Sequence, residues 1–508
     1  MKLQKLIACL QYAVIQSPGP VTEMEVRDVV YHSRKAVEGS LFVCLKGTSD
    51  DGHAHIEEAC AQGACFVMVE KMVFHGKMLH FPENTTVLLV KDTREALAYV
   101  SAAWFHYPAT KLKIIGVTGT KGKTTVTTMI HRILAGTGHK AGLIGTIENI
   151  VGEEQISSIN TTPESFTIHE YFAKMVEAGC EYAVMEVSSQ GIKQKRIEGI
   201  EFAVGVFTNF GEDHIGPREH ASLGEYRYYK SLLFRQCKVG IGNLDDIQCR
   251  YMFRRTSCRK YGYTCRGGKE GASHILQAER IHFLMEEDGP RTWFEIKGCR
   301  YSLEMPGMFN VYNALAALQT AECLGIELCL AAKVLAGVQV RGRTERICTG
   351  EKIACYIDYA HNAMSLQNVL AMFRIYNPHR IILVFGCGGN RAKSRRTQMG
   401  ETAGRLADYT IITSDNPRFE KPEQIIADIV EGMKETAGQY EVIPDRQEAV
   451  EKALENAREG DVVLIAGKGH ETYQEIEGIR YPMDDRRLAE DAFNNLQKGQ
   501  RTCTQTLL

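Results

Sequence analysis

The sequence predicts an α/β protein of three domains, with mainly parallel β-sheets in the second and third. Its 508 residues, against about 150 residues per domain, agree with three domains. Short apolar runs rich in β-branched residues each end at a glycine-rich or polar cluster, as expected of strands buried on both faces of a parallel sheet. The runs are Ile114–Thr118, Tyr182–Val187, Val204–Thr208, Ile381–Phe385, Tyr409–Thr413 and Val462–Ala466.

The pattern of strands and loops predicts where the domains begin and end. Short apolar runs at residues 39–46, 64–70 and 86–90, with a helical stretch over Thr93–Trp104, indicate a small α/β domain over residues 1–108. We expect a central domain over residues 109–340 and a C-terminal domain over residues 341–497. Residues 498–508 are expected to form a frayed tail.

Composition excludes several classes of protein. Lys and Arg (60) nearly balance Asp and Glu (62), so a formal charge of −2 argues against binding to nucleic acid or to a membrane surface. The 16 cysteines include no Cys-x-x-Cys pair, which favours reduced thiols in the cytoplasm over a disulfide framework or a zinc site. No run of about 20 apolar residues predicts a membrane span.

The N-terminus superficially resembles a signal peptide. Gln11 interrupts its apolar run, and no small-residue cleavage site follows. Because Leu6, Leu10 and Val14 recur at helical spacing, we expect an amphipathic first helix instead.

A glycine-rich segment at residues 116–125 is typical of a phosphate-binding loop. It follows a predicted strand and precedes a predicted helix, so its backbone N–H groups and the helix N-terminus can bind phosphate oxygens. Lys123 can reach the β- and γ-phosphates, and the Thr124 hydroxyl can bind Mg²⁺. Strict Walker spacing requires glycine in place of Val117, so this loop is a variant. The segment predicted to bind nucleotide comprises Gly119, Thr120, Lys121, Gly122, Lys123, Thr124 and Thr125.

Two strand ends in the central domain carry candidate metal ligands. Glu186 ends one strand, and Asp213 and His214 follow another. Each alone is compatible with a solvated loop residue, but together beside a nucleotide loop they suggest a metal centre that bridges phosphates. By its sequence context alone, Lys230 is an exposed lysine on a helix.

Two clusters in the C-terminal domain are suited to a zwitterionic ligand. Asp415-Asn416-Pro417-Arg418 places a guanidinium beside hydrogen-bond acceptors at one strand end. Gly467–Glu471 offers backbone amides and a carboxylate at another. A proline turn and a glycine turn are the alternatives. Because ligands bind at the carboxyl ends of parallel strands, we expect the two sheets to present functional edges to one another.

Taken in order, the motifs of the chain resemble those of the Mur ligase family, and within it the ligases that add meso-2,6-diaminopimelate. The resemblance covers nearly the whole chain. It rests on GSLFVCLKGTSDDG after Ser33-Arg34, GTKGKTT, NTTPE from Asn160, EVSSQG, TNFGEDH, Phe309–Ala314, GRTE from Gly342, DYAH from Asp358, GCGGNR, DNPR and GKGHE.

The resemblance implies a UDP-binding N-terminal domain, a P-loop-containing central ATPase domain and a Rossmann-like C-terminal domain that binds an amino acid. It implies an ADP-forming ligase of cytoplasmic peptidoglycan precursor synthesis, with ATP and Mg²⁺. ATP would phosphorylate the D-glutamyl carboxylate of UDP-N-acetylmuramoyl-L-alanyl-D-glutamate. The amine of meso-diaminopimelate would then displace phosphate from the acyl phosphate. No obligate protein partner is implied.

The family's functional positions fall on particular residues of this chain. For catalysis and metal binding these are Lys123, Thr124, Glu186, His214 and Lys230, with Lys230 at the position of a carbamylated lysine. The resemblance adds Asn310, Asp358 and His361 for the nucleotide, and Ser33, Asn160, Thr161, Thr162, Ser188, Gln194 and Arg196 for the UDP-linked substrate. For the amino acid it implies Arg391, Asp415, Asn416, Pro417, Arg418, Gly467 and Glu471.

Several positions depart from the family pattern, mostly near the nucleotide and metal. They are His32, Lys121, Gln190, Gly216–His220, Asn362–Met364, Asn390 and Ala392. Two alternatives follow from them. One is a related Mur-type ligase that uses another amino acid or another carboxylate donor, and the other is a non-catalytic ATP-binding paralogue.

Overall fold

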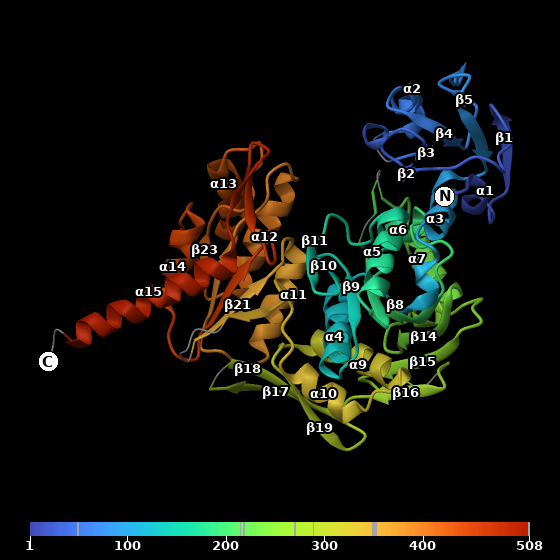
Figure 1. Cartoon of the computed structure of the whole chain (residues 1–508). Coiled ribbons are helices and arrows are strands. Elements are labelled where there is room, and N and C mark those ends of the chain that lie inside the picture. The colour runs from blue at the N-terminus through green and yellow to red at the C-terminus, as the bar shows by residue number, and fades with distance from the viewer. Residues whose placement is uncertain are drawn as a thin grey trace. The chain divides into compact units, whose positions relative to one another are not determined.

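The computed structural model describes residues 1–47, 50–213, 215–216, 219–268, 271–287, 289–347 and 353–505. The chain divides into two compact units (Figure 1). Unit 1 comprises Met1–Leu276 and Ala316–Ala331, and unit 2 comprises Gln277–Leu315 and Ala332–Leu508.

The N-terminal part of unit 1 contains a mixed sheet that carries helices. Its order is β1-β7-β4-β3-β2; β1 is antiparallel to β7, and the other strands pair in parallel. The predicted strands and the predicted helix over residues 93–104 are confirmed. The strands are β1 (Tyr12–Gln16), β2 (Asp28–Val30), β3 (Ser40–Val43), β4 (Ala64–Val69) and β7 (Thr86–Val90), with a small ladder of β5 (Val73–Phe74) and β6 (Lys77–Met78). The helices are α1 (Leu3–Leu6), α2 (Ile56–Ala61) and α3 (Thr93–Trp104).

The prediction of an amphipathic first helix extending to Val14 is wrong. Helix α1 ends at Leu6, and Val14 lies in β1, paired with Leu88 of β7. The β-branched pair Val14-Ile15 favours an extended backbone, and the ladder with β7 supplies the hydrogen bonds that a helix would otherwise provide.

The rest of unit 1 is built on a larger sheet in the order β11-β10-β9-β12-β8-β13-β14-β15-β16. From β9 to β15 neighbouring strands are parallel, as predicted, and β10 turns back antiparallel. The strands are β8 (Lys113–Thr118), β9 (Ala141–Ile144), β10 (Glu148–Val151), β11 (Glu154–Ser157), β12 (Tyr182–Glu186), β13 (Phe202–Phe207), β14 (Cys237–Asn243), β15 (Arg259–Thr264) and β16 (His274–Gln277). The helices are α4 (Lys123–Gly136), α5 (Ser165–Glu177), α6 (Ser189–Lys193), α7 (Leu223–Leu232) and α8 (Cys249–Met252).

Unit 2 contains a second mainly parallel sheet, in the order β20-β21-β25-β22-β23-β24. Its strands are β20 (Glu345–Ile347), β21 (Ala354–Asp358), β22 (Ile381–Phe385), β23 (Tyr409–Ile412), β24 (Gln439–Val442) and β25 (Val462–Ala466). Antiparallel ladders join β17 (Glu279–Glu286), β18 (Gly289–Ile296) and β19 (Cys299–Leu303), and β26 (Tyr473–Ile476) with β27 (Ile479–Pro482). The helices are α9 (Met308–Cys323) and α10 (Leu328–Ala336), which have residues in both units, and α11 (Ala363–Arg374), α12 (Lys393–Leu406), α13 (Pro422–Lys434), α14 (Arg446–Asn456) and α15 (Asp485–Gln505).

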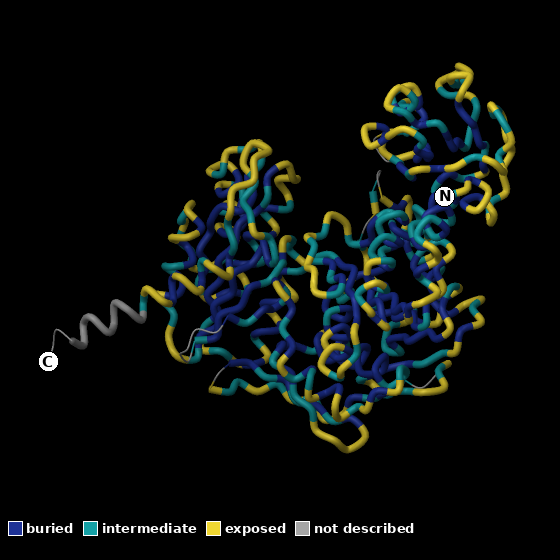
Figure 2. The backbone as a smooth tube through the Cα atoms, viewed as in Figure 1, coloured by how far each residue is buried: buried dark blue, intermediate teal, exposed yellow. Residues whose placement is uncertain are grey.

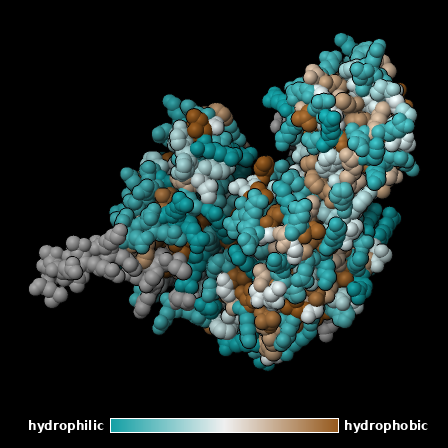
Figure 3. Space-filling model, in the orientation of Figure 1, coloured by the Kyte–Doolittle hydropathy of each residue, from teal (hydrophilic) through white to brown (hydrophobic). Residues whose placement is uncertain are grey.

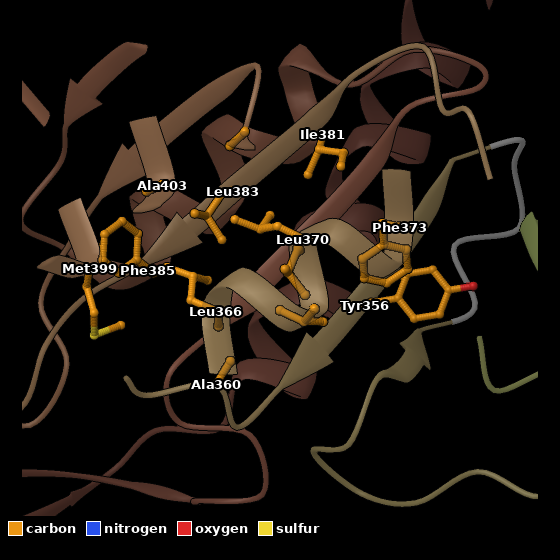
Figure 4. Packing of buried hydrophobic residues seen from close by; sticks show 14 of the residues in the cluster. Tyr356, Ala360, Leu366, Leu370, Phe373, Ile381, Leu383, Phe385, Met399 and Ala403 are labelled. Carbon is orange, nitrogen blue, oxygen red and sulfur yellow. The ribbon is translucent and has the colours of Figure 1, made fainter. Parts of the chain in front are cut away.

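Apolar side chains from both faces of this sheet form the core of unit 2. Leu366, Leu370 and Phe373 of α11 pack toward Leu383 and Phe385 of β22 (Figure 4). All five are fully buried or nearly so. Truncating a buried phenylalanine to alanine costs about 3–5 kcal/mol, so this packing stabilises the sheet from whose strand ends the loops extend.

Burial follows the predicted pattern of strands and loops. The central strands of the sheets, such as β8, β12, β22 and β25, are buried, whereas the edge strands β1, β11 and β24 and many loops and outer helix faces are exposed (Figure 2). On the visible surface, hydrophilic residues surround small groups of hydrophobic ones (Figure 3). Among the described residues, no helix combines the length and apolar character needed to cross a bilayer.

Candidate active site

The glycine-rich segment forms a tight loop between β8 and α4. Gly119 has φ 154° and Gly122, the N-cap of α4, has φ 84°, both in the region that favours glycine. A Cβ at Gly119 would collide with the Thr208 hydroxyl, so no larger residue fits. The loop thus presents backbone N–H groups at the start of a helix of 14 residues, an arrangement that binds phosphate.

Lys123 and Thr124, the first residues of α4, contribute an ammonium group and a hydroxyl group to this loop. The Lys123 ammonium donates to the carbonyl oxygens of Gly119 (3.0 Å) and Thr120 (3.2 Å), so its charge lies over the loop. Thr124 Oγ1 donates to Glu186 Oε2 at 3.0 Å. The structure therefore brings together Lys123, Thr124 and Glu186, as the strand-end pattern predicts.

Glu186 ends β12 and is only 1 % exposed. Its Oε1 accepts from Thr146 N (2.7 Å), and its Oε2 accepts from Thr146 Oγ1 (3.1 Å) as well as from Thr124. One carboxylate beside a hydroxyl fits Mg²⁺, which usually takes one or two carboxylates and completes its shell with phosphates and water. In the described part of the chain, no three His, Cys, Asp or Glu residues form a self-sufficient metal site.

Lys230 is buried, and the expectation of an exposed lysine is wrong. It lies on α7, is 1 % exposed, and donates from Nζ to Gly119 O at 2.7 Å. Its ammonium also lies 4.5 Å from the ring centroid of Tyr226. Burial, and then the positive charge of Lys123, hold the pKa of Lys230 well below its usual value.

Other loop residues are held by the segment that follows β13. Thr120 N donates to Asn209 O (2.9 Å), and Lys121 pairs through Nζ with Asp213 (3.1 Å). Tyr226 OH donates to Thr120 Oγ1 at 3.2 Å, which ties α7 to the loop. Thr125 is buried in the first turn of α4. The predicted metal ligand His214 lies outside the described residues.

Several residues expected to bind the UDP-linked substrate are connected to Glu186 by hydrogen bonds, either directly or through a neighbouring residue. Thr162 Oγ1 donates to Glu186 O (2.9 Å) and accepts from Ser188 N (3.0 Å). Thr161 Oγ1 lies 3.0 Å from Thr146 Oγ1. Arg196 donates to Thr162 O at 2.7 Å. The substrate candidates and the metal candidate therefore share one hydrogen-bond network.

The remaining substrate candidates vary in their surroundings. Asn160 is exposed. Within the described part of the chain, the buried Oε1 atoms of Gln190 and Gln194 have no hydrogen-bond partner. Ser33 is nearly buried near the first sheet, where its hydroxyl donates to Glu58 at 2.6 Å.

The two predicted amino-acid clusters meet at the carboxyl edge of the unit 2 sheet. Asp415–Arg418 follow β23 and Gly467–Glu471 follow β25, with β22 between these strands. Asn416 Nδ2 donates to Glu471 Oε2 at 2.8 Å. Gly467 has φ 111°, and a Cβ there would lie 2.7 Å from Asp415 Oδ2. The proline-turn and glycine-turn alternatives do not account for this side-chain contact between the clusters.

Arg418 links these clusters to the loop after β22. Its NH1 donates to Gly389 O (3.0 Å), and its Nε lies 3.5 Å from Glu475 Oε2. Gly389 N donates in turn to Asn416 O at 2.8 Å, beside Pro417. Arg391, from the same loop, is exposed. Two guanidinium groups thus flank an edge that also carries carboxylates.

The nucleotide candidates of unit 2 are connected through Thr344. Asn310 Nδ2 donates to Pro306 O (2.8 Å) and lies 3.5 Å from Thr344 Oγ1. Thr344 N donates to Asp358 Oδ2 at 2.7 Å, and burial raises the pKa of the Asp358 carboxyl. His361 is exposed, with Nδ1 2.8 Å from Tyr359 O.

Sequence reasoning missed two residues that hold the sites. Thr146 contributes two hydrogen bonds to Glu186, and Arg446 donates to Ser414 O (3.2 Å) and Ala466 O (3.0 Å), the residues just before each amino-acid cluster. Arg446 is 2 % exposed, and its charge is balanced by Asp485, whose Oδ1 lies 2.7 Å from Arg446 Nε. Only the position of Thr146 after an apolar run could have indicated its role. Nothing in the sequence around Arg446 indicates burial.

Comparison with known proteins defines the class of protein to which this fold and these sites belong. Residues 117–321 match the Mur ligase middle domain, and residues 342–469 match the glutamate ligase domain of Mur ligases. The chain belongs to the Mur ligase family and is an ATP-dependent ligase that forms an amide bond. The predicted α/β fold in three domains is confirmed. The predicted domain limits stay a prediction.

Several of the similar proteins within the family carry the same name. A UDP-N-acetylmuramoyl-L-alanyl-D-glutamate--2,6-diaminopimelate ligase of Caldanaerobacter subterraneus subsp. tengcongensis is 39 % identical over 499 residues, covering 98 % of this chain and 100 % of the relative. The enzyme of that name from Geobacillus kaustophilus is 40 % identical over 470 residues, covering 91 % and 93 %. A solved structure with that name is 27 % identical, with a TM-score of 0.69 and coverage of 98 % and 99 %.

Proposed function

We propose that this chain joins meso-2,6-diaminopimelate to the D-glutamyl carboxylate of UDP-N-acetylmuramoyl-L-alanyl-D-glutamate, in the synthesis of the peptidoglycan precursor. The names of the similar ligases support the substrates. The observation that carries the proposal is the contact between Asn416 and Glu471 beside Arg418, which joins DNPR and GKGHE into one charged site for an amino acid.

The phosphate loop of unit 1 activates the acid. A carboxylate becomes reactive only when one of its oxygens becomes a leaving group, and transfer of the γ-phosphoryl group of ATP makes an acyl phosphate. Lys123 lies over the loop and offsets the negative charge that spreads over the phosphoryl oxygens in the transition state. The amine then attacks, and the tetrahedral intermediate releases phosphate to leave the amide.

Magnesium would be held by Thr124 and Glu186, with His214 and a carbamylated Lys230 as further ligands. When bound, it would supply charge neutralisation at the phosphates. The oxygen donors around Glu186 support this assignment.

Carbamylation of Lys230 is supported by the burial of its amine. The neutral amine attacks CO₂, forms a C–N bond and loses a proton, which gives a carbamate of charge −1. Because burial and Lys123 lower the pKa of Lys230, a larger fraction of the lysine is neutral and nucleophilic than in water. The carbamate would replace the buried amine, which donates to Gly119 O, by an oxygen ligand.

Unit 2 selects the amine. Arg418 would pair with the distal carboxylate of meso-diaminopimelate, which lysine lacks, and Arg391, Asp415, Asn416 and Glu471 would bind the remaining charged groups. The contacts of Arg418 with Gly389 and of Asn416 with Glu471 support this assignment. A buried charged group left unpaired costs a few kcal/mol, so this edge would discriminate against lysine.

The donor set beside Glu186 would bind the UDP-linked substrate. Thr161, Thr162, Ser188 and Arg196 share the network around that carboxylate, which supports their assignment. Asn310, Asp358 and His361 of unit 2 would also bind the nucleotide. We expect a cytoplasmic enzyme, where the described cysteines, all free, would stay reduced.

A coupled assay of phosphate release tests the proposal. With ATP, Mg²⁺ and the UDP-linked dipeptide, we expect meso-diaminopimelate to give one phosphate and one tripeptide product per turnover. Turnover with another amino acid or another carboxylate donor, and not with these two, would refute the substrates. No ATP hydrolysis under any combination would leave the non-catalytic paralogue as the explanation.

The same assay tests Lys230. We expect Lys230→Ala to lower kcat by about 10²-fold or more, and short carboxylates such as formate or acetate to restore part of the activity, since they can occupy the space of the carbamate. Rescue by a carboxylate would not follow from damage to the fold alone.

A further inference from the structure

Lys468 lies at the centre of the candidate amino-acid site yet is completely buried. It follows β25 within the loop Gly467–Glu471, and its exposed fraction is 0 %. Its ammonium donates to Asn416 Oδ1 (3.0 Å), Glu471 Oε2 (3.1 Å) and Tyr473 O (2.5 Å). Three acceptors match the three hydrogens of the ammonium, which compensates for its loss of water.

These contacts fix the orientation of the Asn416 amide. Asn416 Oδ1 accepts from Lys468 and also from Glu475 N at 2.9 Å. With its oxygen held by two donors, the amide must direct Nδ2 the other way, where it donates to Glu471 Oε2 at 2.8 Å. A rotated amide would place its NH₂ group against both donors.

Glu471 is consequently held by one of its two oxygens. Oε2 accepts from both Lys468 and Asn416. Among the described residues, no group donates a hydrogen bond to Oε1, and the side chain keeps 18 % of its surface exposed. Oε2 is therefore occupied by hydrogen bonds within the protein, whereas Oε1 is available to a hydrogen-bond donor of a ligand.

We propose that Lys468 is a positioning residue for amide formation, which locks Glu471 and Asn416 so that Glu471 Oε1 receives an ammonium group of the incoming diamino acid. This inference rests on the proposed function, because it takes Glu471 to bind the amino acid. Lys468 acts only through Asn416 and Glu471.

The burial of Lys468 supports a positioning role over simple packing. A buried charged group contributes little net stability, and apolar side chains of similar volume often stabilise a protein as well or better. What Lys468 provides, in contrast to an apolar side chain, is directional hydrogen bonds. These bonds fix the positions of the Asn416 and Glu471 side chains at the site.

Steady-state kinetics of Lys468→Met test the proposal. We expect KM for meso-diaminopimelate to rise at least 10-fold, while KM for ATP and for the UDP-linked dipeptide stays within about 2-fold. Glu471→Gln should also raise KM for meso-diaminopimelate. The double variant should be no worse than the poorer single variant, because both substitutions disable the same interaction.

Arg380→Met is the matched control. Arg380 pairs at 2.6 Å with Asp461, whose side chain is 1 % exposed, at the amino ends of β22 and β25. Its loss also breaks an ion pair of a lysine or arginine with a carboxylate, but at the amino end of β25, whereas Lys468 follows the carboxyl end of that strand. We expect Arg380→Met to lower Tm without raising KM for meso-diaminopimelate.

The outcomes separate this inference from the function on which it rests. If Glu471→Gln raises KM for meso-diaminopimelate and Lys468→Met leaves it within 2-fold, or if the double variant multiplies the two effects, positioning by Lys468 is wrong. If neither Glu471→Gln nor Arg418→Met changes that KM, the proposed amino-acid site itself is wrong. Should Lys468→Met fail to fold, Lys468→Leu, which also removes the donor, is judged by the same criteria.

Discussion

The candidate sites of the two units differ in how far some of their charged side chains are exposed to solvent. In unit 1, Glu186 and Lys230 are each 1 % exposed, and both bind partners around one loop. In unit 2, Arg391 is exposed and Arg418 keeps 26 % of its side-chain surface in solvent. Preorganised buried groups suit phosphoryl transfer, because they need no rearrangement as charge develops, whereas accessible guanidinium groups suit selection of a free ligand.

The backbone differs in the same sense. The positive-φ residues in the loop of unit 1 are glycines, whereas at the edge of unit 2, besides Gly467 and Gly469, Asn390 (φ 56°) and Arg418 (φ 55°) take that conformation. Such residues cost of order 1 kcal/mol or more and persist only where their surroundings hold them. Backbone bonds from Arg418 N to Glu475 O (2.9 Å) and from Glu477 N to Arg418 O (2.6 Å) do so. Strain is thus placed where specificity is expected.

Lys123→Met should have the largest effect, because it removes the charge over the phosphate loop. We expect kcat to fall by about 10³-fold or more, with the affinity for meso-diaminopimelate retained. ADP release measures the first quantity, and calorimetric titration of the amino acid measures the second. Lys140→Met, an exposed change in the same unit, is the control. Comparable losses in both variants would contradict the role of Lys123.

Arg418→Met should alter selection and leave activation intact. We expect the preference for meso-diaminopimelate over L-lysine, as a ratio of kcat/KM values, to fall by about 10²-fold, equivalent to about 2–3 kcal/mol for an unpaired carboxylate. KM for ATP should not change. Equal loss of kcat/KM with both amino acids would show that Arg418 does not recognise the distal carboxylate.

Glu186→Gln should sharpen the assignment of the metal site. The amide keeps one acceptor for Thr146 N but loses the negative charge, so we expect the Mg²⁺ concentration that gives half-maximal rate to rise about 10-fold. A titration of rate against Mg²⁺ measures this shift. If the rate falls but the Mg²⁺ dependence does not move, Glu186 is not a ligand.

His169→Phe should have the smallest effect on activity and a measurable effect on stability in acid. His169 of α5 is 2 % exposed, neither ring nitrogen has a hydrogen-bond partner among the described residues, and burial lowers its pKa to about 4. Because the unfolded state takes up a proton near pH 6.5 and the folded state does not, the free energy of unfolding should decrease between pH 6.5 and pH 4. The loss at pH 5 is about 2 kcal/mol.

Thermal unfolding at pH 7 and pH 5 checks this expectation. The phenylalanine variant should lose less Tm than the parent chain on acidification, with equal activity at pH 7. An identical loss of Tm in both proteins would show that His169 does not contribute to the acid sensitivity.

The sequence predicted the strands of both sheets because buried parallel strands leave a strong local signal. Runs such as Ile381–Phe385 and Val462–Ala466 coincide with β22 and β25 to the residue. Glycine-rich and polar clusters then placed the candidate sites at strand ends. The meeting of Glu471 with Asn416 follows from strand order, which no local pattern contains.

Burial and tertiary pairing were the parts that could not be predicted. Lys230 is flanked by tyrosines and serine, a context that does not distinguish an exposed lysine from one enclosed between α7 and the phosphate loop. The helix predicted from the spacing of apolar residues near the N-terminus was wrong, because pairing with β7 outweighs a weak helical pattern over so few residues. Arg446 donates to Ser414 and Lys468 donates to Asn416, and both of these partners are distant in the sequence, so no local pattern indicates the contacts.

Chemical trapping of the activated acid tests the central claim that unit 1 activates the carboxylate and unit 2 supplies the amine. Borohydride reduces an acyl phosphate to an alcohol, so enzyme incubated with ATP, Mg²⁺ and the UDP-linked dipeptide, without amino acid, should yield a hydroxyl-bearing reduced D-glutamyl residue by mass spectrometry. The account predicts this product from the parent chain and from Arg418→Met, and none from Lys123→Met. Loss of the product in Arg418→Met, or its appearance only when diamino acid is added, would contradict the division of roles.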